Sequence, residues 1–439
     1  MLQRILRFIH YNKIEYSLLV IAIAGFIAEK HIVPSVFTLV AFVTFVYRKY
    51  ISGTDIDYRH RVYDEFKEVS PNGRGYINLK YTNDIPILTL HYDVVDEEYE
   101  YTLGYMQGKY LHKYIKKLVD KFKWFDRGMD MFYDMGKVEV AENYKKELQG
   151  IVDGYNSVSS TSITYMQLLH IHMLPECTNV RKKPMETISD KPLGCTVITE
   201  TDINGVTTMA RNMDWCPFGD LATNTLVVYY TKSKVYSLTI PGIIGVITGW
   251  NESGLCLAMN VSRGYNNKGT PSVFYNRWIL DNYANVYSYV TDRRRIDWYD
   301  KEVISPLGSY HINIIDKYGG KQHIEFNITS DVKTYKHYYE GDGQDLIMTF
   351  NDHSVHENGS IYVLSGWDSR VRERIVRSML EDGATLDNIL SAVPINNNET
   401  CHSVIFMPSE NKVGLAWNNG FAGDAVKTYI QLGVVFEGK

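Results

Sequence analysis

A cysteine, an arginine and an aspartate lie at the two ends of a predicted β-hairpin, and their types suit nucleophilic catalysis. Cys195 follows Gly194, whereas Arg211 and Asp214 come after a predicted turn at Asn204-Gly205. Both turn residues tolerate the positive φ that a two-residue hairpin loop requires. Apolar and β-branched residues flank the turn on both sides. The spacing therefore predicts that Arg211 and Asp214 fold back beside Cys195.

The chemistry of a thiol nucleophile gives each of these residues a role. A cysteine attacks as its thiolate, so its pKa must be lowered or its proton removed. If the chain is cut before Cys195, the new α-amino group, with a pKa of about 8, can act as the general base. Arg211 would stabilise the thiolate, and Asp214 would orient the amine. Gly194 suits the cut itself, because a residue without Cβ most easily adopts strained backbone. The alternative is a buried structural cysteine beside an Arg–Asp pair.

The composition argues against several classes of function. The 46 basic and 51 acidic residues give a net charge of −5, with no basic excess that would favour nucleic acid. Five cysteines are too few and too scattered for a disulfide scaffold, and they form no C-x-x-C pair. Neither an H-E-x-x-H motif nor a phosphate-binding glycine loop occurs, so we expect no metal and no cofactor. The 439 residues allow two domains, or one large two-layer domain with attachments.

The first fifty residues, 1–50, predict a membrane anchor or a signal region. Two apolar runs, 16–28 and 32–47, are separated by three polar residues, and each is shorter than the ~20 residues of a straight span. Basic residues on both sides suit a hairpin with both ends cytosolic. A signal-peptide core, one long tilted anchor and a soluble helical pair are the alternatives. We expect membrane attachment through residues 16–47, on a side that the sequence leaves open.

The remaining chain divides into a linker, a helix-rich segment and a strand-rich segment. Residues 51–75 are polar and contain turn residues, which predicts the linker. Residues 76–194 are helix-rich. Apolar periodicity there predicts a short strand at 85–90 and helices at 101–122, 144–152 and 162–174, the last ending before Pro175.

Strands dominate residues 195–439. We predict strands at 195–199, 206–210, 225–231, 235–240, 243–248, 255–261, 311–316, 322–326, 346–350, 403–407, 413–417 and 429–436. We predict helices at 273–290, 370–380 and 386–393. Strands, helices and strands again in one unit suit antiparallel sheets stacked between helical layers.

The chain resembles the N-terminal-nucleophile (Ntn) hydrolases. Gly194-Cys195-Thr196, followed by residues 210–214, is similar to the nucleophile segment shared by acid ceramidase, N-acylethanolamine acid amidase and choloylglycine hydrolase. Three later blocks follow in that family's order: residues 249–260, with a glycine-strand-asparagine pattern, residues 349–353, with a second asparagine, and residues 368–370, with an arginine. Residues 147–154 are similar to the pro-segment of the related acyl-CoA:isopenicillin N acyltransferases.

The resemblance implies the fold and the processing. It implies an α+β fold, the αββα four-layer sandwich of Ntn hydrolases, made as a precursor. Cleavage between Gly194 and Cys195 would separate a helical pro-segment, 76–194, from the catalytic domain, 195–439. The cleaved halves would remain associated.

The resemblance also implies roles for individual residues. Cys195 would be the nucleophile and, through its freed amine, the base, while Arg211 and Asp214 would hold it in place. Asn260 and Asn351 would donate hydrogen bonds to the oxyanion.

A late arginine and an acyl pocket complete this assignment. Arg370 would complete the polar network, although Arg372 and Arg374 lie close enough for the alignment to slip. We expect Trp215, Phe218 and Trp250 to line an acyl pocket, although aromatic residues in or beside strands are more often core.

The sequence departs from the family at two positions near the predicted site. Val197 stands where acid ceramidase-like members usually carry serine, and Phe350 where threonine usually precedes the asparagine. Neither residue changes a catalytic atom, but both are close enough to alter the pocket.

The function implied is hydrolysis of a linear amide through a thioester at Cys195. An N-acyl lipid of the ceramide or N-acylethanolamine type is the expected substrate. One alternative is an acyltransferase that passes the acyl group to an amine. Another is a catalytically silent, membrane-bound homologue that acts as an interaction protein.

Overall fold

The computed structural model describes residues 62–93, 96–123, 135–177, 195–202, 204–215, 219–265, 268–292, 306–329, 332–338, 346–350, 369–397, 399–418 and 420–433. All of them belong to the compact unit Arg61–Lys439. The predicted membrane segment 16–47 and the predicted cleavage residue Gly194 lie outside these ranges. Within them, no helix combines the length and the apolar character needed to cross a membrane.

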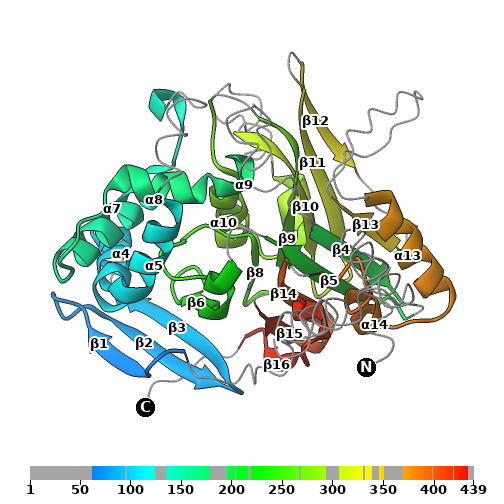
Figure 1. Cartoon of the computed structure of the whole chain (residues 1–439), viewed down its shortest axis with the longest axis horizontal. Coiled ribbons are helices and arrows are strands. Elements are labelled where there is room, and N and C mark those ends of the chain that lie inside the picture. Colours follow the sequence, from blue (N-terminus) through cyan, green and yellow to red (C-terminus); the bar gives the residue numbers. More distant parts are fainter. Residues whose placement is uncertain are drawn as a thin grey trace, which may run out of the picture. The chain divides into compact units, whose positions relative to one another are not determined.

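Two β-sheets form the centre of the described unit (Figure 1). The larger contains, in spatial order, β1 (Phe66–Val69), β2 (Gly75–Thr82), β3 (Ile85–Tyr92), β6 (Leu226–Tyr230), β7 (Val235–Thr239), β8 (Thr248–Asn251), β9 (Cys256–Tyr265), β10 (Gly308–Ile315), β11 (Lys321–Thr329) and β12 (Val332–Tyr338). The smaller contains β13 (Leu346–Thr349), β4 (Cys195–Thr201), β5 (Thr207–Asp214), β14 (Thr400–Met407), β15 (Lys412–Trp417) and β16 (Thr428–Gln431). Within these sheets, β3 pairs in parallel with β6, and the other pairs are antiparallel.

Helices cover the outer face of each sheet. Those on the larger sheet are α4 (Tyr99–Tyr110), α5 (His112–Phe122), α7 (Glu142–Asn156), α8 (Tyr165–His172), α9 (Leu174–Cys177), α10 (Ser272–Asn282) and α11 (Val286–Thr291). Those on the smaller sheet are α13 (Ser369–Glu381) and α14 (Leu386–Leu390). Short 3-10 helices span Met135–Lys137, Gly219–Asn224, Pro408–Glu410 and Ala422–Asp424.

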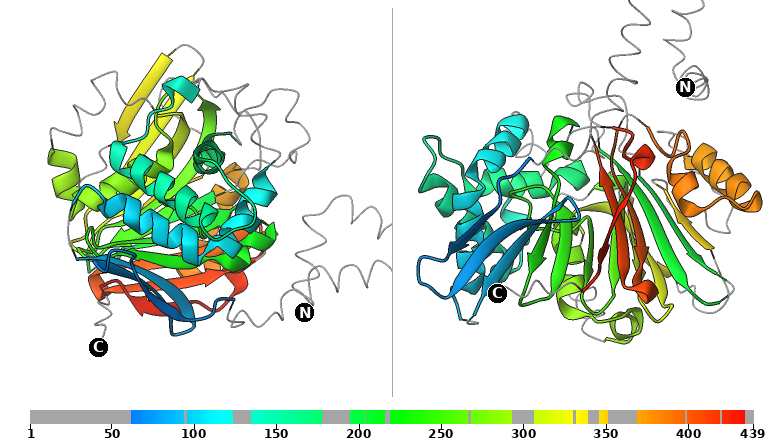
Figure 2. Two further views of the ribbon diagram at one scale, coloured as in Figure 1. Left: turned by 90° about the vertical axis from the view of Figure 1, so that its left-hand side faces the viewer. Right: turned by 90° about the horizontal axis from the view of Figure 1, so that it is seen from below.

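Side chains of alternate residues separate the layers, because successive residues of a strand point to opposite faces. On β4, Val197 packs between the two sheets, with Trp250 and Phe406, whereas Ile198 packs outward against Ile389 of α14. The right-hand view of Figure 2 shows both sheets between the cyan helices and the orange helices. This order of helix, sheet, sheet and helix confirms the predicted α+β, αββα arrangement.

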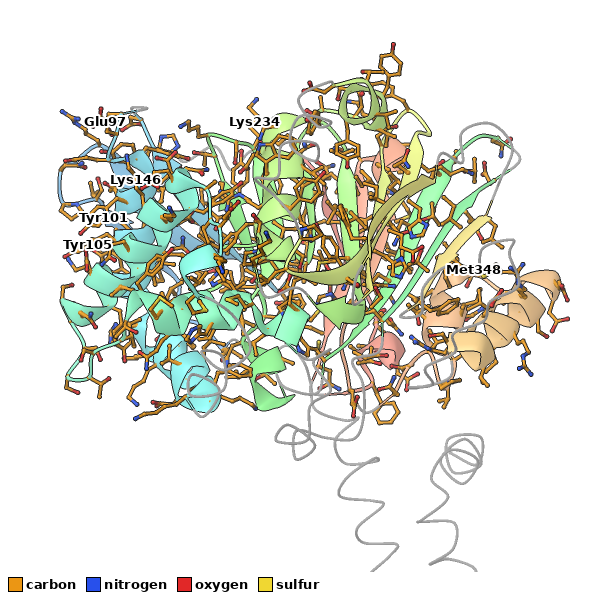
Figure 3. All side chains as sticks on the ribbon, turned by 90° about the horizontal axis from the view of Figure 1, so that it is seen from above. Glu97, Tyr101, Tyr105, Lys146, Lys234 and Met348 are labelled. Carbon is orange, nitrogen blue, oxygen red and sulfur yellow. The ribbon has the colours of Figure 1, made fainter. Side chains whose placement is uncertain are left out.

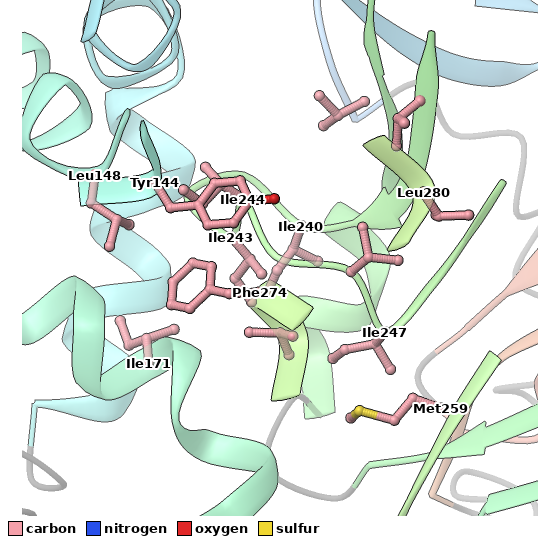
Figure 4. Packing of buried hydrophobic residues seen from close by; sticks show 14 of the residues in the cluster. Tyr144, Leu148, Ile171, Ile240, Ile243, Ile244, Ile247, Met259, Phe274 and Leu280 are labelled. Carbon is pink, nitrogen blue, oxygen red and sulfur yellow. The ribbon is translucent and has the colours of Figure 1, made fainter. Parts of the chain in front are cut away.

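The helices α7 and α8 of the predicted pro-segment pack on α10 of the predicted catalytic domain through aromatic and aliphatic side chains (Figure 4). The ring of Phe274 on α10 stacks on Tyr144 of α7, with ring centroids 5.5 Å apart, and on His172 of α8, 5.1 Å away. Ile171 and Ile244 belong to the same buried cluster. These contacts bury the apolar face of the helical layer against the segment that precedes β8.

Each of two long helices predicted from the sequence is a pair of shorter helices in the structure. The helix predicted over 101–122 breaks at Leu111, whose backbone leaves the helical region while its side chain stays buried. The helix predicted over 273–290 breaks at Tyr283, and Asn285 caps a new helix together with Ser288. Apolar periodicity continues across both breaks, because the two helices of each pair bury residues in the same core.

Of three other predictions, two require correction. The linker 51–75 contains β1 and the start of β2, which Asn83 and Asp84 join to β3 through a turn with positive φ at both residues. The helix predicted over 162–174 is α8, which ends at His172, before Pro175 as expected, and Leu174–Cys177 form the separate short helix α9. The apolar run 243–248 is irregular apart from Thr248, the first residue of β8, because its backbone groups bond to side chains and to other segments.

Four glycines bring α4 and α7 into backbone contact. A Cβ at Gly104 would lie 2.0 Å from the carbonyl oxygen of Glu147, and one at Gly150 would lie 2.1 Å from that of Tyr101. Gly108 and Gly154 make equally close approaches. Tyr101 and Tyr105 of α4, labelled in Figure 3, donate hydrogen bonds across this contact to Asp153 and Ser157.

We expect Gly104→Ala to destabilise the protein by about 3 kcal/mol or more, because the added methyl group forces the two helices apart. Thermal unfolding measures the effect as a lower Tm. Gly433→Ala is the matched control, because the nearest atom to its Cβ is 3.9 Å away, the Oδ1 of Asn411. An equal Tm for the two variants would contradict this account of the helix pair.

Candidate active site

The β4–β5 hairpin brings the predicted nucleophile and its arginine together. Cys195 pairs with Met213, and Val197 pairs with Arg211, so the side chains of Cys195 and Arg211 lie on the same face of the smaller sheet. Gly205 takes the positive φ, +79°, that the sequence predicts, but the loop is longer than the predicted two residues, since the Asp202 N–H donates a hydrogen bond to the Val206 carbonyl. The Cys195 side chain is 5% exposed.

Arg211 is buried completely, and its guanidinium bridges the two sheets. Nη2 lies 3.8 Å from Cys195 Sγ and donates a hydrogen bond to the carbonyl oxygen of Met259 on β9. Nη1 donates to the Ile247 carbonyl at 2.9 Å and to the Thr248 hydroxyl. The positive charge next to the sulfur favours the thiolate form of Cys195.

A second layer of polar groups holds Arg211 in this position. The Thr248 hydroxyl, which accepts from Arg211, is also 3.0 Å from Nε2 of His402 on β14. Burial, together with the Arg211 charge, holds the pKa of His402 well below its ordinary value, so this imidazole is neutral. A neutral ring avoids placing a second buried positive charge next to Arg211.

Asp214 lies at the end of β5 and is held through both carboxylate oxygens. The Thr400 hydroxyl donates to Oδ1 at 2.6 Å, and the Asn397 amide donates to Oδ2 at 2.9 Å. Burial raises the pKa of Asp214 to about 6, against the opposing effect of Arg372 and of these hydrogen bonds. Asp214 therefore changes charge near neutral pH rather than at its ordinary value near 4.

The arginine that reaches the nucleophile from α13 is Arg372. Its Nη1 donates to the carbonyl oxygen of Cys195 at 2.6 Å and to the Thr196 hydroxyl at 3.0 Å. The side chain is 2% exposed. The sequence favoured Arg370, whose side chain lies outside the described part, and named Arg372 as an alternative; the described contacts with Cys195 and Thr196 are made by Arg372. Arg372 is three residues after Ser369 and four before Val376, which are both buried. This helical spacing places Arg372 on the inward face of α13 and distinguishes it from its neighbours.

Asn260, one of the two predicted oxyanion donors, is buried at the centre of β9. Its Nδ2 donates to the carbonyl oxygens of Thr349 at 2.9 Å and Phe350 at 3.4 Å. Asn351, the other predicted donor, lies outside the described residues. The carbonyl oxygen of the preceding residue, Met259, accepts a hydrogen bond from Arg211. Two successive residues of β9 therefore connect Arg211, beside Cys195, with the end of β13.

Opposing effects act on the ionisation of Cys195. Burial raises the pKa of the thiol, Arg211 lowers it, and the negative charge of Asp214 raises it, with a net upward shift. The sulfur is therefore a protonated thiol in the intact chain. A separate base is needed to ionise it, as the predicted mechanism supplies through the freed α-amino group.

A small pocket opens in front of the sulfur. It is lined by Pro175, Cys195, Arg211, Met213, Asp214, Trp215, Ile247, Met259 and Val261, and its cavity volume is about 20 Å³. That volume suits a single water molecule. Most of the lining side chains are apolar, so the pocket combines a thiol and an arginine with an apolar wall.

The three aromatic residues predicted to line an acyl pocket have different surroundings. Trp215 lines the pocket beside Cys195. Trp250 does not, because its ring stacks on Tyr236, with centroids 5.2 Å apart, and its Nε1 donates to the Leu432 carbonyl. Trp250 is therefore a core residue between the sheets, which corrects the prediction. Phe218 lies outside the described residues.

We expect Arg372→Gln to lower the free energy of unfolding by about 3 kcal/mol, because it leaves buried polar groups of the site without their cationic partner. Arg374→Gln is the matched control, since Arg374 is exposed on the same helix. Thermal unfolding of both variants measures the difference. Equal stability of the two would show that the Arg372 contacts contribute nothing.

The raised pKa of Asp214 predicts a pH-dependent stability. The folded protein binds this proton up to pH 6 and the unfolded chain only up to about pH 4, so ionisation of Asp214 destabilises the fold as pH rises through this window. Asp214→Asn cannot ionise, so its stability relative to wild type should rise by about 3 kcal/mol between pH 4 and pH 7.

Tm measured across that range checks this prediction. Asp382→Asn, which alters an exposed carboxylate, is the control and should show no comparable trend. A pH-independent difference between Asp214→Asn and wild type would contradict the burial of a proton-binding carboxyl group.

Solved structures with low sequence identity resemble this chain. An N-acylethanolamine-hydrolyzing acid amidase ortholog from Caenorhabditis elegans is 19% identical, with a TM-score of 0.38, and the match covers 49% of this chain and 93% of that one. A mutant of conjugated bile acid hydrolase from Clostridium perfringens is 12% identical, with a TM-score of 0.32 and coverage of 55% and 94%. Penicillin V acylase from Agrobacterium tumefaciens is 11% identical, with a TM-score of 0.30 and coverage of 51% and 83%.

The sequence itself matches one family. Residues 201–358 match the model of the acyl-coenzyme A:6-aminopenicillanic acid acyl-transferase family. The matched range contains Arg211, Asp214, Asn260 and Asn351, and it begins after Cys195. No curated protein matches the chain. Through residues 201–358, the chain is related to the N-terminal-nucleophile hydrolases.

Proposed function

We propose that the protein is a cysteine amidase that becomes active when the chain is cut between Gly194 and Cys195. One observation carries this proposal: a completely buried arginine lies 3.8 Å from the sulfur of Cys195, at an apolar pocket. A structural cysteine needs no cationic partner, and burial of an arginine is costly unless its charge is used. The Arg211 charge therefore supports a reactive thiol.

The proposed reaction has two steps. The freed α-amino group of Cys195 takes the thiol proton, and Sγ attacks the carbonyl carbon of the amide. The C–N bond then breaks, the amine leaves with that proton, and a thioester remains. Water attacks the thioester, which releases the carboxylic acid and restores the thiol. Asp214 would hold the ammonium form of the chain start between these steps.

The pocket lining supports an acyl group on the carbonyl side of the substrate. Met213, Trp215, Ile247 and Val261 offer apolar surface next to the sulfur. Each methylene group buried there would contribute about 0.8 kcal/mol to binding. The present cavity, at about 20 Å³, holds no fatty chain, so binding requires the lining to move. We propose an N-acyl lipid, of the ceramide or N-acylethanolamine type, as the substrate.

Buried contacts between the two parts support continued association after the cut. β3 of the pro-segment pairs with β6 of the catalytic domain over four residues. The carboxylate of Glu176 accepts hydrogen bonds from the backbone N–H and the hydroxyl of Ser272 on α10. Glu147 lies 3.9 Å from Arg277, also on α10, and both are buried. Separation would expose these charges and the apolar layer around them.

An acyltransferase is the second candidate, and the family match favours it. The first step and all of its residues are the same in both reactions. An amine would then take the place of water and attack the thioester. Adding an acceptor amine to the assay would convert the released acid into a new amide.

We also propose that residues 16–47 attach the protein to a membrane. The support comes from their two apolar runs with basic flanks. Such an anchor would keep the enzyme close to a lipid substrate.

Intact-mass measurement and a panel of fatty amides test the proposed function together. We expect wild-type protein to separate under denaturing conditions into fragments 1–194 and 195–439, and to release fatty acid. Cys195→Ala should keep the mass of the whole chain and lose at least about 1,000-fold in kcat. Cys256→Ala, at a fully buried core cysteine, is the control and should behave as wild type.

The outcomes separate the candidates. Fatty acid released equally by Cys195→Ala and wild type would contradict the mechanism. An uncut and inert wild-type chain would instead favour a silent homologue. A cut chain that forms a new amide with an added amine would identify the acyltransferase.

A further inference from the structure

A polar chain of three side chains joins the two sheets beside the candidate active site. The Thr349 hydroxyl, at the end of β13, donates to Oδ1 of Asn313 on β10 at 2.8 Å. The Thr349 carbonyl accepts from Nδ2 of Asn260 on β9 at 2.9 Å. Asn260, Asn313 and Thr349 are each at most 3% exposed. One residue of the smaller sheet is thus held by two asparagines of the larger sheet.

The strand register explains why both asparagines reach Thr349. Asn260 pairs with His311, and Asn313 pairs with Ala258, so Asn260 and Asn313 are diagonal neighbours on one face of the larger sheet. Ala258 packs in the layer between the sheets, so this face is the one turned toward the smaller sheet. The small Ala258 side chain leaves space for polar groups among larger apolar ones.

The same end of β13 lies next to the nucleophile. Thr349 pairs with Val197 on β4, two residues from Cys195. The ring of Phe350 lies 5.3 Å from the guanidinium carbon of Arg372, which donates to the Cys195 carbonyl. Movement of Thr349 would therefore change the spacing between Asn260 and Cys195.

The two hydrogen bonds of the Asn260 amide differ in strength. The bond to Thr349 at 2.9 Å is of normal length, whereas the contact with Phe350 at 3.4 Å is long and weak. An amide nitrogen carries two hydrogens. The strong bond fixes the plane of the amide, and the weakly bonded hydrogen is the one that an oxyanion can take over.

We propose that Thr349 and Asn313 are positioning residues that orient the Asn260 amide toward the carbonyl attacked by Cys195. This inference rests on the proposed amidase function. Thr349 acts through Asn260 and touches no substrate. Removing one partner of a buried hydrogen bond leaves the other without a partner, which costs more free energy than removing both. The Thr349 hydroxyl and the Asn313 side chain therefore act as one unit.

The test compares Thr349→Val, which removes only the hydroxyl, with Thr349→Ser, which keeps it. The probe is the para-nitroanilide of lauric acid, and its hydrolysis gives kcat and KM. We expect Thr349→Val to lower kcat by about 10- to 100-fold with little change in KM, because a misplaced donor weakens transition-state binding alone. Asn313→Leu should do the same, and the double variant should be no worse than either single variant.

Thr207→Val is the matched control. Thr207 is also buried in the smaller sheet, and its hydroxyl donates to the Gly319 carbonyl in the turn between β10 and β11 of the larger sheet, at the far end of the hairpin. Its kcat and KM should equal those of wild type. The alkylation rate of Cys195 by iodoacetamide should stay unchanged in Thr349→Val, since the nucleophile itself is intact. Unchanged kcat in Thr349→Val, or a loss that Thr349→Ser does not rescue, would overturn the proposal.

A second measurement does not depend on activity. Hydrogen–deuterium exchange of a peptide covering residues 346–350 should be faster in Thr349→Val and Asn313→Leu than in wild type, Thr349→Ser or Thr207→Val. Equal exchange in all five proteins would overturn the proposal even if the enzyme is active. If wild-type protein hydrolyses no anilide but exchange follows the expected order, the amidase function fails while the contact between the sheets stands.

Discussion

The fully buried guanidinium of Arg211 is the interaction on which the site depends. Removing such a charge from water costs several kcal/mol, which a set of well-placed partners must offset. Carbonyl oxygens of Ile247 and Met259, the Thr248 hydroxyl and the Cys195 sulfur supply that set. Because two of these partners belong to the larger sheet, one to the irregular segment before β8 and the sulfur to the smaller sheet, the guanidinium fixes the distance between the sheets beside Cys195.

Continuous contacts connect the helical layer on the larger sheet to this arginine. His172 of α8 accepts a hydrogen bond from the Ile244 N–H at 2.9 Å, and Arg277 donates to the Ile244 carbonyl at 3.0 Å. Three residues later the same loop presents the Ile247 carbonyl to Arg211. The loop is irregular because its backbone groups serve these side chains instead of a sheet. A movement of the helical layer would therefore be transmitted through one short loop to Ile247, whose carbonyl oxygen accepts from Arg211.

Local chemistry accounts for the parts of the site that the sequence could predict. The Asn204-Gly205 turn and the apolar residues around it specify the hairpin, and the hairpin register alone pairs Val197 with Arg211. The succession of strands, helices and strands likewise suits antiparallel sheets stacked between helical layers, and the family resemblance implies the four-layer order. Arg372 was missed in favour of Arg370, since an alignment by motif ignores which positions of a helix face inward. Trp250 was misplaced for a related reason, because an aromatic residue in a strand has no local signal that separates core from pocket.

The sequence by itself determined the β4–β5 hairpin and most of the order of strands and helices. These depend on interactions between residues close in the chain or on a repeating apolar pattern. Tertiary structure decided the rest: the irregular course of 243–247, the reach of Arg372 to the Cys195 carbonyl, and the contact of Asn260 and Asn313 with Thr349. These contacts join residues far apart in the chain, such as Arg211 with Ile247 and Asn313 with Thr349, each pair 36 positions apart. Such pairings depend on how two sheets face one another, which no local pattern encodes.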